Sequence, residues 1–495
     1  MKSRFAGTPA RLVVFLGLAF VSVGTSNAGL REDERELLSE IKITRMMSTV
    51  EDLCIEGYRG RGAGSAECRD VADYLASEFR MRGLSVLSRP GLEGYKQPFT
   101  IRHALVRSKD EIKATLSYDM PGRRGPTERI RLFAYRGFNG RGGLDLSSEV
   151  VFVGWGVCDP ASGCDSYAGL DVTGKIVVWL AGKPKGMDLS VGVTDAHKMV
   201  TAYRHGAAAC IVSRPAGAKY GLMTNVGVPG AIADFPCIAV DENVASELLS
   251  PAEVNVGRLL LEKPHHLPTG ARGVNLRLQI TPICDPDRRV YNVIGMVPGT
   301  DPRVAHEVVL IGAHYDHIGY GASGEVFQGA DDNASGVSVI LELARGVLDA
   351  GLRPRRTIVF AAWTGEEANL AGSNHFVENP PFPLGDMVSC VHVEMVGAGT
   401  PGVFVATNPS PYSEGYRHLL TSVDDLGFAL ETDVSSGSSD YLPFLRRRVP
   451  SFLICSAGEH PNYHTTGDTP AAVNRKVLES AARLATLVVW RAANT

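Results

Sequence analysis

The feature that most constrains the fold is a series of near-continuous apolar segments in the second half of the chain. They occupy 290–295, 308–313, 356–363 and 389–393, and an amphipathic helical pattern at 334–348 separates two of them. Apolar runs that alternate with helices are typical of strands buried on both faces. The sequence therefore predicts an α/β fold in which a mixed, largely parallel sheet is flanked by helices.

Acidic and histidine side chains gather where these predicted strands end, at the start of the helix and in a loop before the last helix. The members of this set are His314, Asp316, Asp332, Glu366, Glu367, Glu394 and His464. Ligands of an open α/β sheet bind beyond the carboxyl ends of its strands. We therefore expect one crevice to collect these side chains.

So many carboxylates in one crevice repel each other unless cations neutralise them. Histidine and carboxylate ligands without cysteine suit zinc, with manganese or cobalt as alternatives. Three carboxylates, from Asp332, Glu367 and Glu394, and one hydroxide would balance two divalent ions. The neutral imidazoles of His314 and His464 would complete the set. The sequence thus predicts two divalent metal ions, zinc foremost, that activate water.

Composition excludes several other classes of function. The 495 residues include 50 Lys and Arg against 54 Asp and Glu, for a formal net charge of -4. A chain without basic excess cannot neutralise a phosphate backbone, so nucleic acid is not an expected partner. No stretch after residue 30 is apolar enough to span a bilayer.

The first 28 residues have the pattern of a signal peptide. Lys2, Arg4 and Arg11 precede an apolar run from 12 to 23, and Ser26-Asn27-Ala28 resembles a cleavage site. An uncleaved membrane anchor is the alternative. We expect a mature chain that starts near Gly29 and is secreted or periplasmic.

Cysteines and segment composition suggest further organisation. In an oxidising compartment, Cys54 with Cys68 and Cys158 with Cys164 could each close a small loop.

The pattern of residues 146–265 indicates a compact, β-rich unit that ends in a proline-containing linker. This predicts a main domain in two parts, 29–145 and 266–495, with an insertion between them.

The motifs around the predicted metal site resemble those of the M28 family of zinc aminopeptidases. They are His314-Tyr-Asp-His-Ile-Gly, Gly329-Ala-Asp-Asp-Asn-Ala-Ser-Gly, Gly365-Glu-Glu and the late His464. The segment Tyr58-Arg-Gly-Arg-Gly-Ala-Gly-Ser is also similar to that family's amino-terminal region. The resemblance implies a zinc-exopeptidase fold and a peptide substrate.

The middle unit resembles a protease-associated (PA) domain. Gly154-Trp-Gly and His205-Gly-Ala-Ala-Ala-Cys-Ile-Val carry this likeness. M28 peptidases often hold such a domain inside the catalytic one. We therefore interpret 146–265 as an inserted PA domain that covers the substrate entrance or binds partners.

The M28 resemblance also implies roles for single residues. One metal would be held by His314, Asp332 and Glu394, and the other by Asp332, Glu367 and His464. The general base would be Glu366, and Asp316 would orient His314. We interpret Asp331 as the N-cap of the following helix and Tyr441 as a candidate oxyanion or substrate contact.

One position departs from the family pattern, because Glu394 stands where the family usually has Asp. A glutamate is common there in the related M20 peptidases, which include carboxypeptidases. The expected activity is that of an aminopeptidase, and a carboxypeptidase on the same scaffold stays open. A glutaminyl cyclase with one zinc and a non-catalytic, receptor-like protein are further alternatives.

Overall fold

The structure is a computed structural model. The residues that it describes are 29–89, 91–101, 112–119, 127–129, 134–136, 144–159, 162–187, 189, 195–215, 235–282, 289–320, 325–407, 413–433 and 439–495. The signal-peptide prediction for residues 1–28 falls outside this set.

The first sheet has eight strands and holds the predicted site. Its order is β1 (Lys96–Thr100), β12 (Arg289–Val297), β14 (Thr357–Trp363), β13 (Val308–His314), β15 (Met387–Val393), β18 (Ser451–Ser456), β16 (Val403–Thr407) and β17 (Ala429–Asp433). The four central strands, β14, β13, β15 and β18, run parallel to each other. The predicted mixed, largely parallel sheet is confirmed.

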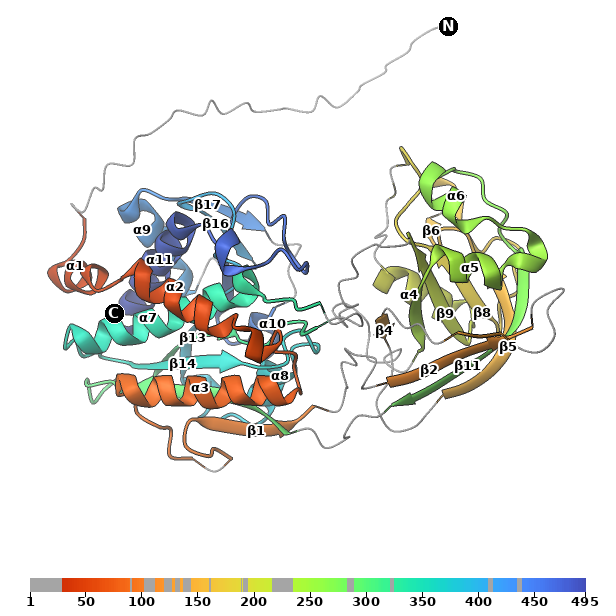
Figure 1. Ribbon diagram of the computed structural model, residues 1–495. Coiled ribbons are helices and arrows are strands. Elements are labelled where there is room, and N and C mark those ends of the chain that lie inside the picture. The colour runs from red at the N-terminus through yellow and green to blue at the C-terminus, as the bar shows by residue number, and fades with distance from the viewer. Residues whose placement is uncertain are drawn as a thin grey trace, which may run out of the picture.

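Helices cover both faces of this sheet, as its near-continuous apolar strands predict (Figure 1). They are α1 (Glu32–Ser39), α2 (Ile43–Leu53), α3 (Ala66–Arg82), α7 (Ser335–Asp349), α8 (Ala371–Glu378), α9 (Glu414–Leu426), α10 (Tyr441–Arg446) and α11 (Arg475–Asn494). Alternate strand residues face opposite ways. Ile311 and Phe360 lie in one core with α2, α3, α7, α9 and α11, and Leu310 lies in the other core with α8 and α10.

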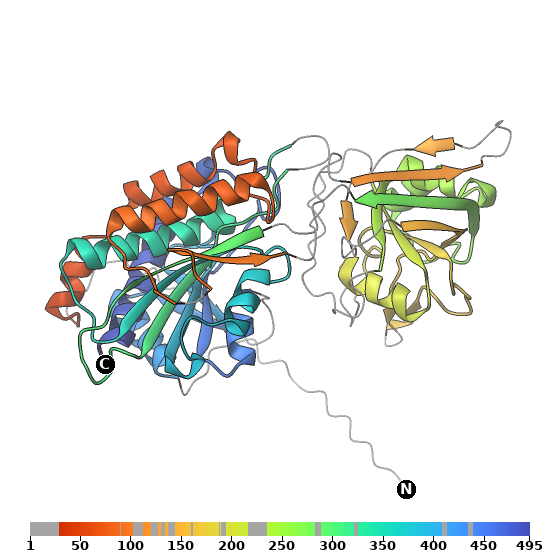
Figure 2. The same ribbon diagram turned by 90° about the horizontal axis from the view of Figure 1, so that it is seen from below.

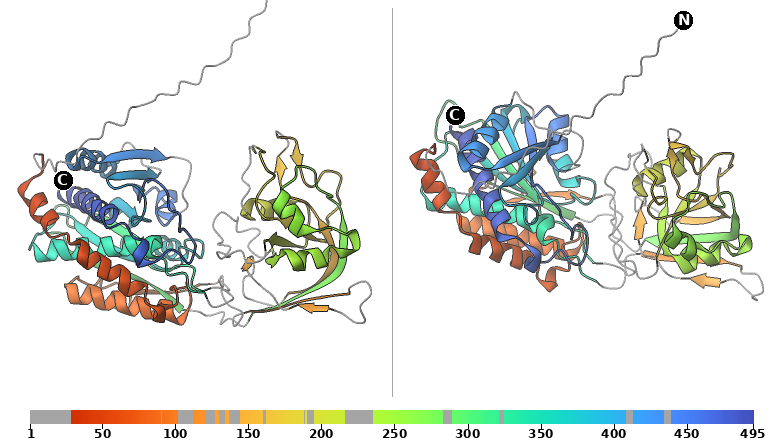
Figure 3. Two further views of the ribbon diagram at one scale, coloured as in Figure 1. Left: turned by 45° about the horizontal axis from the view of Figure 1, so that its top comes forward. Right: turned by 90° about the horizontal axis from the view of Figure 1, so that it is seen from above.

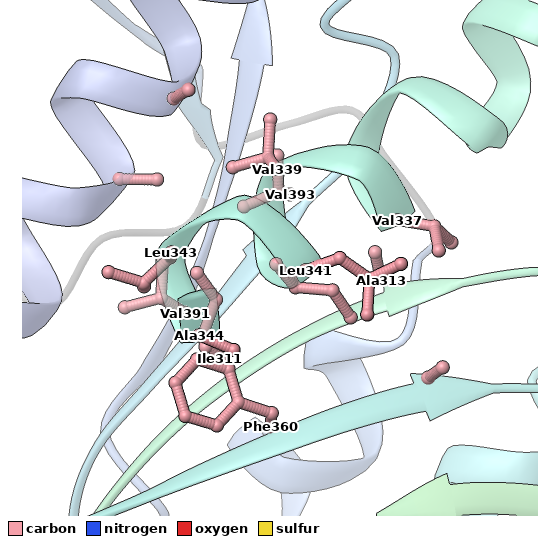
Figure 4. Packing of buried hydrophobic residues seen from close by; sticks show 14 of the residues in the cluster. Ile311, Ala313, Val337, Val339, Leu341, Leu343, Ala344, Phe360, Val391 and Val393 are labelled. Atoms are coloured by element: carbon pink, nitrogen blue, oxygen red, sulfur yellow. The ribbon is translucent and has the colours of Figure 1, made fainter. Parts of the chain in front are cut away.

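Figure 4 shows how α7 packs on the central strands. Val337 and Leu341 of the helix lie in the same core as Ala313 and Phe360 of the strands. The helix starts at the predicted metal site, so this packing fixes the helix end against the strand ends.

Helix α3 illustrates how local sequence sets an element's limits. The Ser65 hydroxyl accepts a hydrogen bond from the Cys68 N–H and caps the start of the helix. Gly83 ends it with a left-handed φ of 83°, a conformation that costs glycine little.

The second sheet also has eight strands. Its order is β3 (Thr127–Arg129), β2 (Ile112–Tyr118), β11 (Arg272–Pro282), β5 (Leu144–Phe152), β8 (Ile176–Leu180), β9 (Ala209–Arg214), β10 (Cys237–Asp241) and β4 (Ala134–Arg136). The strands come from residues 112–282, on both sides of the span 146–265 that we expect for the insertion. The PA assignment and the domain limits stay predictions.

Each sheet forms a lobe of its own, and the views agree on this (Figures 1 and 2). Helices α4 (Asp195–Arg204), α5 (Glu242–Leu248) and α6 (Val256–Glu262) belong to the second lobe (Figure 3). In the part of the chain that the structure describes, none of the helices combines the length and the apolar character that a membrane span requires.

The expected disulfides do not form. The described cysteines are all free thiols. Cys158 lies opposite Asp165 and Cys164 opposite Asp159 in the short hairpin of β6 (Cys158–Asp159) and β7 (Cys164–Asp165). Residues of neighbouring pairs point to opposite faces of a hairpin, so this register keeps the two thiols apart.

Candidate metal centre

The predicted site residues converge at one edge of the first sheet. The parallel strands β14, β13 and β15 are neighbours, with His314 paired to Trp363 at their carboxyl ends. Beyond this edge lie the turn with Glu366 and Glu367, the residue Glu394, the segment before α7 with Asp332, and the loop with His464. The structure thus brings together all five predicted ligands.

These ligands form two groups that share Asp332. The first group is His314, Asp332 and Glu394. Nε2 of His314 lies 3.3 Å from Oδ1 of Asp332. The Ser439 hydroxyl donates a hydrogen bond to Oε2 of Glu394. Because the Ser439 hydroxyl engages one oxygen, that hydrogen bond orients the longer glutamate side chain.

The second group contains one histidine more than predicted. It is His317, Asp332, Glu367 and His464. Nε2 of His464 lies 3.1 Å from Oδ2 of Asp332 and 3.1 Å from Oε1 of Glu367. Nδ1 of His317 lies 3.1 Å from the same Glu367 oxygen and 3.5 Å from the same Asp332 oxygen. The sequence signal for His317 was its place three residues after His314, at the same strand end.

Donors in these groups are of the kind that a metal ion would satisfy. Nε2 of His314 and both carboxylate oxygens of Glu367 are buried and accept or donate no hydrogen bond among the described residues. Buried polar atoms are normally paired, and divalent cations pair with imidazole and carboxylate. The two groups therefore fit two metal ions, with Asp332 offering one oxygen to each.

The charges of the site act strongly on one another. Burial lowers the pKa of His314, but Asp332, Glu366 and Glu394 outweigh it and raise that pKa well above its ordinary value. In the same way, Glu367 and Asp332 overcome burial and raise the pKa of His464 to about 10. In the absence of metal, the imidazoles thus take protons to balance the carboxylates.

Two carboxyl groups also have raised pKa values, but here burial itself is the largest cause of the rise. Burial, followed by the charges of Glu394 and Glu367, raises the pKa of Glu366 well above its ordinary value. Burial raises the pKa of Glu394 to about 7, and the nearby Asp332 adds to the shift. Glu366 is therefore a carboxyl group in a dry, negative setting, which favours proton uptake.

Asp316 acts on the Glu366–Glu367 turn more directly than on His314. Its carboxylate accepts hydrogen bonds from the N–H groups of Glu366, at 3.1 Å, and Glu367, at 3.3 Å. The contact with His314 uses the backbone, because Nδ1 lies 3.1 Å from the carbonyl oxygen of Asp316. The carbonyl leaves Nε2 of His314 facing Asp332. The Asp316 carboxylate is farther from this ring, with Oδ1 at 3.8 Å from Nδ1, and the role of Asp316 in orienting His314 stays a prediction.

Asp331 is not the N-cap that we expected. Its carboxylate accepts a hydrogen bond from the N–H of Gly397 at 2.7 Å and lies 2.6 Å from Nδ1 of His460. The reason is local, because Asp331 lies in the turn η5 (Ala330–Ala334), where Asp332 and Asn333 have non-helical backbone angles, and α7 starts only at Ser335. Asp331 therefore ties the Asp332 segment to the loop after Glu394.

Arg61 is a further residue that sequence reasoning missed. Its side chain is fully buried, and its guanidinium donates to the carbonyls of Tyr315 at 2.8 Å, Gln328 at 2.5 Å and Gly329 at 2.8 Å. It also donates to the carbonyl of Leu53 at 2.7 Å. One cation thus joins the segments that carry His314 and Asp332.

The two tyrosines near the site differ in exposure. Tyr441, our candidate substrate contact, is fully buried. Tyr463 is 51% exposed, and its ring stacks on His464 with centroids 3.9 Å apart. Although half of this side chain is exposed, the protein around its phenol and the charges of Asp332 and Glu367 raise the pKa of Tyr463, so the phenol keeps its proton.

The first sheet carries two linked groups of imidazole and carboxylate side chains at its strand ends. This arrangement is that of a candidate two-metal centre. Residues 292–489 match the family model for Peptidase family M28. The matched segment contains all five predicted ligands, from His314 to His464.

Relatives and solved structures extend the comparison. The chain is 27% identical over 221 residues to leupeptin-inactivating enzyme 1 of Streptomyces exfoliatus, which covers 40% of this chain and 48% of that protein. It is 30% identical over 195 residues to aminopeptidase YwaD of Bacillus subtilis (strain 168), which covers 38% of this chain and 41% of the other. The chain thus spans less than half the length of these curated relatives.

The fold is similar to that of a zinc aminopeptidase from Bacillus subtilis, BSAP. The TM-score is 0.64 at 22% identity, over 92% of this chain and 96% of the other. An aminopeptidase from Aneurinibacillus sp. strain AM-1 gives a TM-score of 0.62 at 21% identity, over 93% and 96%. At this identity the likeness concerns the fold, and it spans both lobes.

Proposed function

We propose that the protein is a two-zinc aminopeptidase that removes amino-terminal residues from peptides. The observation that carries this proposal is the sharing of Asp332. Its Oδ1 faces His314 of one group, and its Oδ2 faces His464 of the other. A carboxylate that offers one oxygen to each of two ligand groups is suited to bridging two ions.

The chemistry follows from the family and from the site. Zinc ions bound there would supply the Lewis acidity that activates water and polarises a peptide carbonyl. The first ion would be held by His314, Asp332 and Glu394, and the second by Asp332, Glu367 and His464.

Glu366 has the properties of the general base. It is buried, and its backbone N–H is fixed by the Asp316 carboxylate. Its raised pKa favours taking a proton from the attacking water. The same carboxyl group would then return the proton to the leaving amine.

Tyr463 would contact the substrate. It is exposed beside the ligand His464, and its phenol keeps a proton that a developing oxyanion could accept as a hydrogen bond. We assign it this role in place of the buried Tyr441.

We also propose that the protein acts outside the cytoplasm, as a secreted or periplasmic enzyme. The support is the signal-peptide pattern of residues 1–28. Amino-terminal sequencing of the exported protein would test it, with a mature end near Gly29 as the expected result.

A substrate panel with and without a chelator tests the activity. We expect release of the chromophore from aminoacyl substrates, loss of this release with the chelator, and recovery with zinc. Amino-terminally blocked peptides separate the alternatives, because a carboxypeptidase on the same scaffold would still cleave them. One zinc per chain and cyclisation of amino-terminal glutamine would instead indicate a glutaminyl cyclase.

A further inference from the structure

We propose that His317 is a metal ligand and that the two metal positions therefore differ in kind. One position has four protein donors and is closed. The other has three and is open to water and substrate. This inference rests on the proposed two-metal function and adds to it a division of roles between the ions.

The distances among the four donors support a closed position. For donors about 2.1 Å from a zinc ion, tetrahedral geometry places neighbouring donors about 3.4 Å apart. Nδ1 of His317 lies 3.1 Å from Oε1 of Glu367 and 3.5 Å from Oδ2 of Asp332. Nε2 of His464 lies 3.1 Å from each of these oxygens. Four of the six donor–donor distances of a tetrahedron are thus close to this value, and all four donor atoms lie within 4.8 Å of one another.

The chain makes specific room for the His317 ring. A Cβ atom on Gly329 would lie 2.5 Å from the ring, so only glycine fits there, and its φ of 63° also favours glycine. The backbone N–H of His317 donates a hydrogen bond to the carbonyl of Arg61 at 3.2 Å. With its ring fully buried and its backbone fixed, His317 is held in place before any ion binds.

The other position has fewer donors. It uses His314, Oδ1 of Asp332 and Glu394, and the Ser439 hydroxyl engages Oε2 of Glu394. Zinc sites with four protein ligands are typically structural, and those with three keep a place for water or substrate. The ion at this position is thus the one that meets the peptide carbonyl.

Zinc titration of the metal-free protein tests the proposal by affinity. We expect two ions per wild-type chain with unequal affinities. The His317→Ala variant should bind the tighter ion at least about 100-fold more weakly, because it loses a direct ligand. His317→Asn, which keeps a polar side chain but is shorter, should show the same loss. The control is His375→Ala, which removes a histidine outside both groups and should keep both affinities.

The outcomes separate this inference from the proposed function. If His317→Ala and His317→Asn both keep the wild-type affinities while the wild type binds two ions and releases amino-terminal residues, His317 is no ligand and only this inference is wrong. If the wild type binds no zinc, both proposals fail.

Discussion

The two lobes have the same kind of sheet edge but place side chains of different charge there. Both sheets contain four adjacent parallel strands, β14-β13-β15-β18 in one and β5-β8-β9-β10 in the other. In the first lobe, the strand ends carry carboxylates and imidazoles. In the second, the ammonium of Lys198 donates to the carbonyls of Leu180 at 2.9 Å and Gly182 at 2.6 Å, just past the end of β8.

The comparison shows that the strand order positions a site at the sheet edge, whereas the side chains at the strand ends decide whether it can bind metal. Among the described residues, groups that could hold a metal occur only in the first lobe. The second lobe places its own cation at a strand end, whereas the first needs cations from solution. The following variants test which side chains serve the metal site and which stabilise the fold. They run from the largest expected effect on turnover to no effect.

Glu366→Gln should have the largest effect on turnover. Removing a general base lowers the rate by roughly 10²–10⁴-fold. The zinc content should stay at two ions per chain, because Glu366 belongs to neither ligand group. Steady-state kinetics with metal analysis would check this. Turnover near the wild-type rate would remove Glu366 from the base role.

Arg61→Ala should weaken the site without touching a ligand directly. It removes four hydrogen bonds to backbone carbonyls, although that of Gly329 still accepts from the Ala334 N–H and that of Gln328 from the Cys54 thiol. An orphaned buried carbonyl costs about 1–3 kcal/mol, and the segments that carry His314 and Asp332 lose their common donor. We expect zinc affinity to fall about 10–100-fold. Added guanidinium ions should restore part of this affinity.

A matched control for this variant is Arg491→Ala. Arg491 is also a buried arginine, but it pairs with Glu34 and Asp425 away from the site. Both variants should unfold at lower denaturant concentrations. Equal zinc affinities in the two variants would mean that Arg61 only stabilises the fold.

Ser439→Ala should have a smaller effect that is confined to the open position. Without this donor, Glu394 loses the hydrogen bond that orients it. Loss of such a supporting contact typically costs about 10-fold in affinity. Zinc titration should show weaker binding of the second, looser ion alone. A matching loss at the tighter ion would contradict the assignment of Glu394 to the open position.

Lys198→Met should leave turnover unchanged and alter the pH dependence of stability. Burial lowers the pKa of Lys198 to about 8 from 10.5, so between these values the unfolded chain binds more protons. The free energy of unfolding of the wild type should therefore rise with pH through this window, by at most about 3 kcal/mol. Denaturation at pH 7.5 and 9.5 would show a smaller rise in the variant. Equal slopes would contradict this account of Lys198.

The central fold and the five ligands could be predicted from the sequence because local pattern determines them. The apolar runs at 308–313, 356–363 and 389–393 indicate buried strands, and parallel neighbours bring their ends together. Acidic and histidine side chains at those strand ends must then lie close together.

The residues that were missed depend on contacts that no local pattern encodes. Arg61 reaches the carbonyl of Tyr315 across 254 positions, and backbone acceptors leave no mark in the sequence. His317 lies in the loop after a strand, where spacing does not tell which way a ring points. Asp331 precedes a helix as an N-cap would, and only its contacts with Gly397 and His460 show its other role.

Anomalous diffraction at the zinc edge, from crystals of the zinc-loaded protein, tests the central claim most directly. We predict two peaks about 3.5–4 Å apart on either side of Asp332. One should contact His317, Glu367 and His464, and the other His314 and Glu394. A single peak, or peaks away from Asp332, would contradict the two-metal account.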